Sequence, residues 1–199
     1  GEFNAYNILA VYACALLFGQ DREEVMKAIS VLETVSGRFE YVRSNNGIVA
    51  VIDYAHTPDA LNNVLSTINQ IKPGNRELIT VVGAGGNRDK DKRPMMAKVA
   101  VEKSNKVIIT SDNPRDEDPE VIIEDMIQGV EVPYKQKVLT ITNRREAIKT
   151  ACMMAGEGDI ILIAGKGHET YQEVNGKRYP FSDLETAQQY LDMKGEVKV

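Results

Sequence analysis

Apolar residues recur along the chain with two different periods, and the change of period divides the sequence into two parts. In 4–18, apolar residues surround most of the circumference of a helix, so we predict a helix that packs against a large partner. In 22–32, apolar residues three or four positions apart follow Asp21, which is a favourable capping residue. The sequence therefore begins with two predicted helices.

After Gly37 the pattern changes to short apolar runs that alternate with helical segments. Turn residues at 45–47 separate the first two predicted strands, and Pro or Gly punctuates several of the later boundaries. We predict strands at 38–42, 48–53, 78–82, 106–110, 138–142 and 160–164, helices at 57–71, after Pro94, at 120–128, at 144–155 and after Ser182, and a hairpin at 171–179. This alternation predicts an α/β, Rossmann-like domain with a mainly parallel sheet, helices on both faces and a terminal β-hairpin.

Composition and charge fit a globular protein rather than a membrane or nucleic-acid-binding one. The 199 residues are 43% hydrophobic and 27% charged, and the apolar runs are too short to cross a bilayer. A net charge of −5 argues against binding to a nucleic acid. Cys14 and Cys152 lack CxxC spacing, so we expect reduced, buried thiols in a cytoplasmic protein.

The segment SDNPR follows the predicted strand at 106–110. In open α/β sheets, ligands bind at the carboxyl ends of the strands, where this segment is expected to lie. Arg115 offers a planar fork for a carboxylate, Asn113 both donates and accepts, and Asp112 suits an ammonium group, so together they suit an amino acid. The alternative is that the segment only turns the chain and that Asp118 caps the next helix.

Three other loops follow predicted strands and carry candidate chemistry. In DYAHTP, Asp53 suits ribose hydroxyls and His56 lies just before a helix; alternatively, Asp53 and Thr57 only cap that helix. In GAGGNRDKDKRP, glycines allow a ligand to approach the backbone, and Arg88 stands where the GxGxxG pattern requires its third glycine. Its alternating charges also fit a solvated loop that neutralises itself.

The last loop, AGKGHET, is not a phosphate-binding P-loop. Gly167 stands where that motif requires Ser or Thr. Gly165 still permits close backbone approach, and Glu169 suits an ammonium group. The chain has two histidines, too few for a histidine-rich metal cage, so we predict no metal site in this chain.

Six segments in fixed order resemble the Mur ligase family over nearly the whole chain: GEFNAYNILA, SGRFE, DYAHTPDAL, GAGGNRDKDKRP, SDNPRDEDP and AGKGHE. SDNPR together with GKGHE is the most specific part of this resemblance. It implies an ATP-dependent amide ligase of three domains, in which 1–44 ends the central ATP-binding domain and 45–199 forms the C-terminal, amino-acid-binding domain. Because the central P-loop is missing from the sequence, we expect the chain by itself to be inactive.

The resemblance also implies a reaction in cytoplasmic peptidoglycan precursor synthesis. ATP, with Mg²⁺ bound mainly by the missing central domain, converts UDP-N-acetylmuramoyl-L-alanyl-D-glutamate to an acyl phosphate, and the amine of meso-diaminopimelate attacks it. Two alternatives remain open at this point. One is a lysine-adding or folylpolyglutamate-type ligase, and the other is an amino-acid-binding module without catalytic activity.

Family resemblance assigns residues to two groups of ligand contacts. On the nucleotide side it places Asn4 and Asn7 near adenine, Asp53 at the ribose with His56 nearby, and Arg38 at the ATP phosphates as a catalytic residue. For meso-diaminopimelate it assigns Arg88, Asp112, Asn113, Arg115, Gly165 and Glu169. Relatives that add lysine tend to lack the arginine of DNPR, and lysine has no distal carboxylate to pair with it, so meso-diaminopimelate is the expected substrate.

Overall fold

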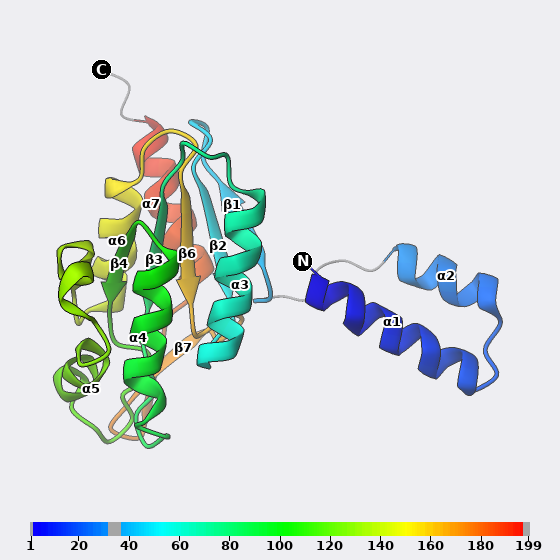
Figure 1. Cartoon of the computed structure of the whole chain (residues 1–199), viewed down its shortest axis with the longest axis horizontal. Helices are drawn as coiled ribbons and strands as arrows, with labels where there is room; N and C mark the ends of the chain where they lie inside the picture. The colour runs from blue at the N-terminus through cyan, green and yellow to red at the C-terminus, as the bar shows by residue number, and fades with distance from the viewer. Residues whose placement is uncertain (1, 32–36, 197–199) are drawn as a thin grey trace. The chain divides into compact units, whose positions relative to one another are not determined.

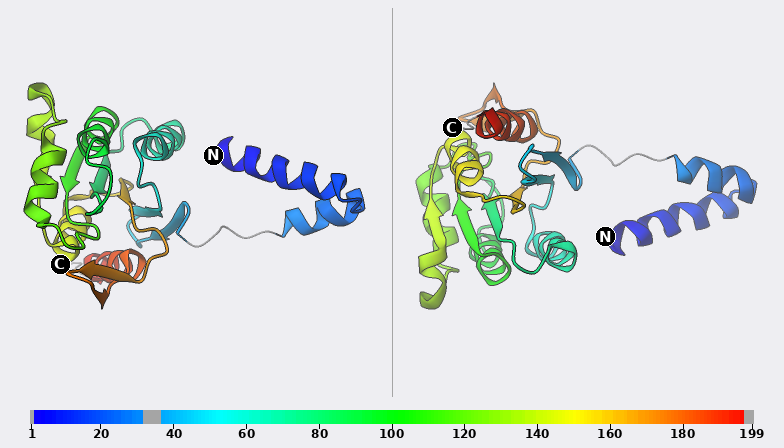
Figure 2. Two further views of the ribbon diagram at one scale, coloured as in Figure 1. Left: turned by 90° about the horizontal axis from the view of Figure 1, so that it is seen from below. Right: turned by 90° about the horizontal axis from the view of Figure 1, so that it is seen from above.

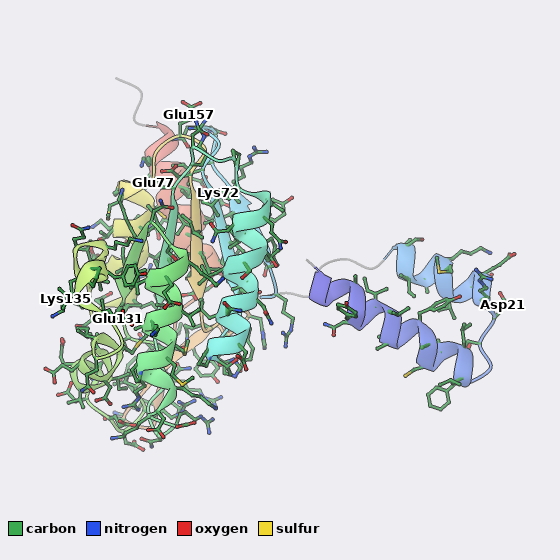
Figure 3. All side chains as sticks on the ribbon, in the orientation of Figure 1. Asp21, Lys72, Glu77, Glu131, Lys135 and Glu157 are labelled. Carbon is green, nitrogen blue, oxygen red and sulfur yellow. The ribbon has the colours of Figure 1, made fainter. Side chains whose placement is uncertain are left out.

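The computed structural model describes residues 2–31 and 37–196, which divide between two compact units, Gly1–Val35 and Ser36–Val199. The first unit contains α1 (Glu2–Leu17) and α2 (Arg22–Ser30). Asp21, labelled in Figure 3, caps α2 by accepting from the backbone N–H groups of Glu23 and Glu24. Both predicted helices are therefore present. Phe18, which directly follows α1, is 83% exposed.

The second unit is built on a six-stranded sheet with the order β1-β2-β6-β3-β4-β5. β1 pairs antiparallel with β2, and the other neighbouring strands are parallel. A separate two-stranded hairpin, β7–β8, follows the sheet, which confirms the predicted α/β architecture. The strands are β1 (Glu40–Arg43), β2 (Val49–Asp53), β3 (Leu78–Val82), β4 (Lys106–Ile109), β5 (Val138–Thr140), β6 (Ile160–Ala164), β7 (Tyr171–Val174) and β8 (Lys177–Pro180).

Helices cover both faces of this sheet (Figures 1 and 2). They are α3 (Pro58–Ile71), α4 (Lys92–Lys103), α5 (Pro119–Ile127), α6 (Arg144–Met154) and α7 (Asp183–Glu196). Successive side chains of a strand point to opposite faces, and β6 illustrates this, because Leu162 packs in the core under α3, α4 and α5 while Ile161 and Ile163 pack under α6 and α7. Burial on both faces explains why the central strands are continuously apolar.

Two features of the second unit differ from the sequence-based predictions. α4 begins at Lys92, whereas the prediction had it begin after Pro94. A proline is tolerated in the first turn of a helix, because the N–H that it lacks would have no hydrogen-bond partner within the helix. A 3₁₀ helix at Val132–Lys137 was not predicted. β1 pairs with β2, and the compact second unit spans Ser36–Val199.

The two cysteines lie in different environments. Both cysteines are free thiols, and burial raises the pKa of Cys152 to about 12. Cys14 is exposed, so the prediction of two buried thiols was wrong for it. None of the helices within 2–31 and 37–196 combines the length and apolarity required to cross a membrane.

A fully buried ion pair joins helices α6 and α7 to the sheet. Arg144 donates from Nε and Nη2 to both carboxylate oxygens of Asp183, at 2.8 and 2.7 Å. The same guanidinium also donates to the backbone carbonyls of Ser111, at 3.4 Å, and Ala164, at 3.0 Å, which lie at the carboxyl ends of β4 and β6. Arg144 therefore ties two strand ends to the first residue of α7.

We expect Arg144→Met to lower the free energy of unfolding of the second unit by about 3 to 5 kcal/mol, because Asp183 would stay buried without its partner. Urea unfolding followed by circular dichroism measures this. The matched control is Arg145→Met, which changes an exposed neighbour that lies 5.5 Å from the Phe181 ring and should cost about 1 kcal/mol or less. Equal losses in the two variants would contradict a clamping role for Arg144.

Candidate functional site

Four loops meet at the carboxyl edge of the parallel strands and enclose a cavity of about 340 Å³. They follow β2, β3, β4 and β6. Glu77 and Glu157, labelled in Figure 3, precede β3 and β6 and so mark the opposite, amino-terminal edge. All six residues assigned to the amino acid line this one cavity: Arg88, Asp112, Asn113, Arg115, Gly165 and Glu169.

Beneath the cavity lies a buried lysine that the sequence analysis did not assign to the site. Lys166 is fully buried at the end of β6. Its ammonium donates to Asn113 Oδ1 at 2.8 Å, to Glu169 Oε2 at 3.0 Å and to Asp112 Oδ1 at 3.4 Å. One cation thus joins the DNPR loop to the loop after β6.

Asn113 serves the structure as well as the cavity. Its Oδ1 accepts from Lys166 and from the backbone N–H of Glu173, and its Nδ2 donates to Glu169 at 2.8 Å. Burial raises the pKa of the Glu169 carboxyl, but hydrogen bonds from Asn113 and Lys166 outweigh this, and the net pKa is lowered. Glu169 is therefore held as a carboxylate, which suits an ammonium ligand.

The hairpin β7–β8 is bound along the DNPR loop and supports it from outside the sheet. Arg115 donates its backbone N–H to the carbonyl of Glu173 at 3.0 Å, and its own carbonyl accepts from Asn175 at 2.7 Å. Gln172 Nε2 donates to the carbonyl of Asp112 at 2.6 Å. These bonds fix the loop, and Arg115 lies in it with a positive φ of 52°.

The Arg115 side chain crosses to the glycine-rich loop after β3. Its Nη1 donates to the carbonyl of Gly86 at 2.8 Å, and its Nε lies 3.9 Å from Glu173 Oε2. A side chain at Gly86 would begin 1.9 Å from the Pro114 carbonyl oxygen. Gly86 is thus required for the contact between two protein loops, whereas the sequence had suggested that it allows approach of a ligand.

A buried arginine at the start of α4 supports the DNPR loop and the glycine-rich loop after β3. Arg93, 1% exposed, pairs with Glu117 at 2.8 Å and Asp125 at 2.9 Å, and its Nε has no hydrogen-bond partner among the described residues. Hydrogen bonds from Arg93 and from the backbone N–H of Asn87 lower the pKa of Glu117 to about 2. Part of the charged run neutralises itself, as the alternative reading held, since Lys92 lies 3.5 Å from Asp89.

Three of the residues assigned to the nucleotide belong to the second unit: Asp53 ends β2, His56 lies in the loop after it, and Arg38 precedes β1. Asp53 Oδ2 accepts from the backbone N–H of Phe39 at 2.8 Å, and burial raises its pKa, which hydrogen bonds and the charge of Arg38 partly offset. Arg38 is exposed, and its guanidinium carbon lies 6.0 Å from the centre of the Tyr54 ring. Neither Arg38 nor Asp53 lines the cavity, whereas His56 does.

In the loop after β2, helix capping explains Thr57 but not Asp53. Thr57 Oγ1 accepts from Ala60 N at 3.2 Å and caps α3, while Asp53 bonds to the segment before β1 instead. In the other unit, Asn7 is exposed, and the side chain of Asn4 lies outside the described residues. Across the described ranges, His, Cys, Asp and Glu form no group of three or more that could hold a metal ion.

Comparison with protein families identifies the family to which this domain belongs. A family model described as "Mur ligase, glutamate ligase domain" matches residues 37–167. The chain belongs to the Mur ligase family. This confirms the resemblance seen in the sequence motifs.

Among Mur ligases, the chain is similar to enzymes named UDP-N-acetylmuramoyl-L-alanyl-D-glutamate–2,6-diaminopimelate ligase. It is 55% identical to one from Cytophaga hutchinsonii over 196 residues, or 98% of the chain and 40% of that protein. It is 50% identical to one from Aquifex aeolicus over 195 residues, or 98% of the chain and 39% of that protein. The chain therefore spans about 40% of the length of these relatives.

Solved structures give the same result for the fold. A structure titled as a diaminopimelate ligase of the same name matches with a TM-score of 0.75 at 42% identity, covering 98% of this chain and 39% of that one. A UDP-N-acetylmuramate-alanine ligase from Thermotoga maritima matches with a TM-score of 0.66 at 19% identity, covering all of this chain and 39% of the other. The second match supports the fold alone.

Three buried cations around the site were missed by sequence analysis, namely Arg93, Arg144 and Lys166. Lys166 had one signal, because it stands between two glycines directly after an apolar strand, where a solvated lysine would have little room. Arg93 and Arg144 stand in charged, helix-forming segments and have no such signal. Their partners are distant in sequence, so only the tertiary structure identifies them.

We expect Glu117→Gln to destabilise the second unit at pH 7 by about 1 to 3 kcal/mol and to have little effect at pH 2. The folded pKa lies below the ordinary value, so the stabilisation is present above about pH 4.5 and is lost as the pH falls toward 2. Urea unfolding at pH 7 and near pH 2 checks this. Glu146→Gln, which removes an exposed carboxylate, is the control, and an equal loss at both pH values for Glu117→Gln would contradict the prediction.

Proposed function

We propose that this chain is the amino-acid-binding part of an ATP-dependent ligase that adds meso-diaminopimelate to UDP-N-acetylmuramoyl-L-alanyl-D-glutamate. The observation that carries the proposal is the joint placement of two arginines, Arg88 and Arg115, and one lowered-pKa carboxylate, Glu169, around a single cavity. The names of the similar enzymes support the same substrates. We place this reaction in the cytoplasm.

Charge complementarity selects the amino acid in this proposal. Meso-diaminopimelate ends in a second amino acid head, whose carboxylate suits Arg88 and Arg115 and whose ammonium suits Glu169. Lysine carries the ammonium but no distal carboxylate, so it would leave the arginines unpaired. A lysine-adding ligase is the remaining alternative, and it is less well matched to these two arginines.

On the nucleotide side, we propose that Asp53 binds the ribose of ATP with His56 nearby and that Arg38 contacts its phosphates. Asp53 is half-buried at the end of a strand and keeps charge support from Arg38, which fits a hydroxyl acceptor next to an anion-binding group. Asn4 and Asn7 would contact adenine. ATP, when bound, supplies the phosphoryl group that activates the acceptor carboxylate. Mg²⁺ would be held mainly by a central domain. We assign 1–44 as the last part of that central domain and 45–199 as the C-terminal domain that follows it.

We expect Arg115→Ala in the full-length enzyme to lower kcat/KM for meso-diaminopimelate by about 10- to 100-fold, the value of one charge-assisted hydrogen bond. Activity with lysine should change far less. Competition between the two amino acids measures this, with Arg145→Ala as the control, since Arg145 is an exposed arginine that does not line the cavity. If both amino acids lose activity by the same factor, Arg115 only supports the loop through its bond to Gly86.

We expect Asp53→Ala in the full-length enzyme mainly to raise the KM for ATP, because a ribose contact is present before and during reaction. Arg38→Ala should mainly lower kcat, because charge that develops on the phosphates strengthens its contact. Initial rates at varied ATP concentration separate the two effects. Wild-type values of both kcat and kcat/KM for Arg38→Ala would remove it from the catalytic residues.

A further inference from the structure

Lys166 has every donor occupied by the protein and does not line the cavity. A lysine ammonium has three N–H donors, and three side-chain oxygens accept from it, on Asp112, Asn113 and Glu169. Its side chain is 0% exposed. Lys166 therefore cannot itself bind the substrate, and any effect on binding must pass through the residues that it holds.

Two of these partners are carboxylates that lie close together under the cavity. Without a cation between two such carboxylates, like charge and burial favour the protonated form of one of them. Lys166 supplies that cation, and it leaves the pair Asp112 and Glu169 with one net negative charge. This charge is what a single ligand ammonium requires.

Charged and titratable groups from every neighbouring element face this cluster. Arg115 lies in the DNPR loop, and Glu173 lies on β7 next to it. Burial lowers the pKa of Arg144 of α6, but Asp183 and the charges of both carboxylates outweigh this, and the net pKa is raised. The Tyr171 ring lies 5.7 Å from the Lys166 ammonium and 4.4 Å from the Arg178 guanidinium. Lys166 is the cation that makes the direct contacts with the carboxylates.

We propose that Lys166 is a positioning residue that fixes the carboxylate of Glu169, in its charged form, to receive the distal ammonium of a diamino acid. The inference rests on the proposed function for the identity of the ligand. It rests on the geometry alone for the action of Lys166 on Glu169. Asn113 completes the arrangement, since its amide bridges Lys166 and Glu169 and is itself held by the hairpin.

The first test needs no substrate. In protein labelled with ¹³C at glutamate carboxyl groups, with the Glu169 signal assigned by Glu169→Gln, Lys166→Met should raise the titration midpoint of Glu169 by about 1 to 2 pH units. Lys149→Met, on the exposed surface of α6, should leave it unchanged. Lys166→Gln, which keeps two donors but no charge, provides the uncharged variant if Lys166→Met does not fold. An unshifted Glu169 in a folded uncharged variant would overturn the proposal.

The second test measures binding in the full-length enzyme. Lys166→Met or Lys166→Gln should raise the KM for meso-diaminopimelate by about 10-fold near pH 5, where Glu169 of these variants would be largely protonated, and leave the KM for ATP within about twofold. The defect should shrink as the pH rises through the new Glu169 midpoint. Equal changes in the KM of both substrates, or a defect independent of pH, would indicate loosened loops and overturn the proposal.

The two tests separate this inference from the proposed function. If wild-type enzyme does not bind meso-diaminopimelate but the Glu169 midpoint shifts in the lysine variants, the proposed substrate is wrong and the action of Lys166 on Glu169 is supported. If wild type binds meso-diaminopimelate and the midpoint does not shift, the proposed function stands and the role of Lys166 is overturned.

Discussion

The ammonium group of Lys166, buried without exposure at the end of β6, is the interaction on which the candidate site depends. A buried charge is costly unless it is paired and hydrogen-bonded, and here Asp112, Asn113 and Glu169 supply the compensation. The compensation requires the loops after β4 and β6 to adopt one relative position. The cavity above them is therefore shaped by the need to satisfy one cation.

Two further buried cations fix other segments at the same edge of the sheet in the same way, because each needs paired partners. Arg144 binds backbone carbonyls of both strand ends and pairs with Asp183 of α7, while Arg93 pairs the start of α4 with Glu117 and Asp125. Each joins segments that are distant in sequence. Fixed loops of this kind can hold ligand groups in place, so the cations inside the protein support the more exposed groups that line the cavity.

The candidate nucleotide and amino acid groups are linked through the sheet itself. Asp53 ends β2 and Gly165 follows the adjacent β6, and the Gly165 backbone N–H donates to the Asp53 carbonyl at 3.0 Å. Gly165 has a φ of 118°, and a side chain there would begin 2.7 Å from Asp112 Oδ2. The two ligand regions therefore meet at one backbone position that requires glycine.

The sequence by itself determined the fold class, nearly all the helices and strands, the family and the six residues assigned to the amino acid, all of which line the cavity. It could do so because hydrophobic periodicity and turn residues are local signals, because polar segments after parallel strands gather at one edge of the sheet, and because the motifs in those segments resemble the family. Only the tertiary structure decided that Lys166, Arg93 and Arg144 are buried, that Asn113 and Gly86 bind other loops, and that β1 joins the main sheet. Those features depend on partners far away in the chain. The identity of a charged residue does not reveal whether a distant partner will offset the cost of removing its charge from water.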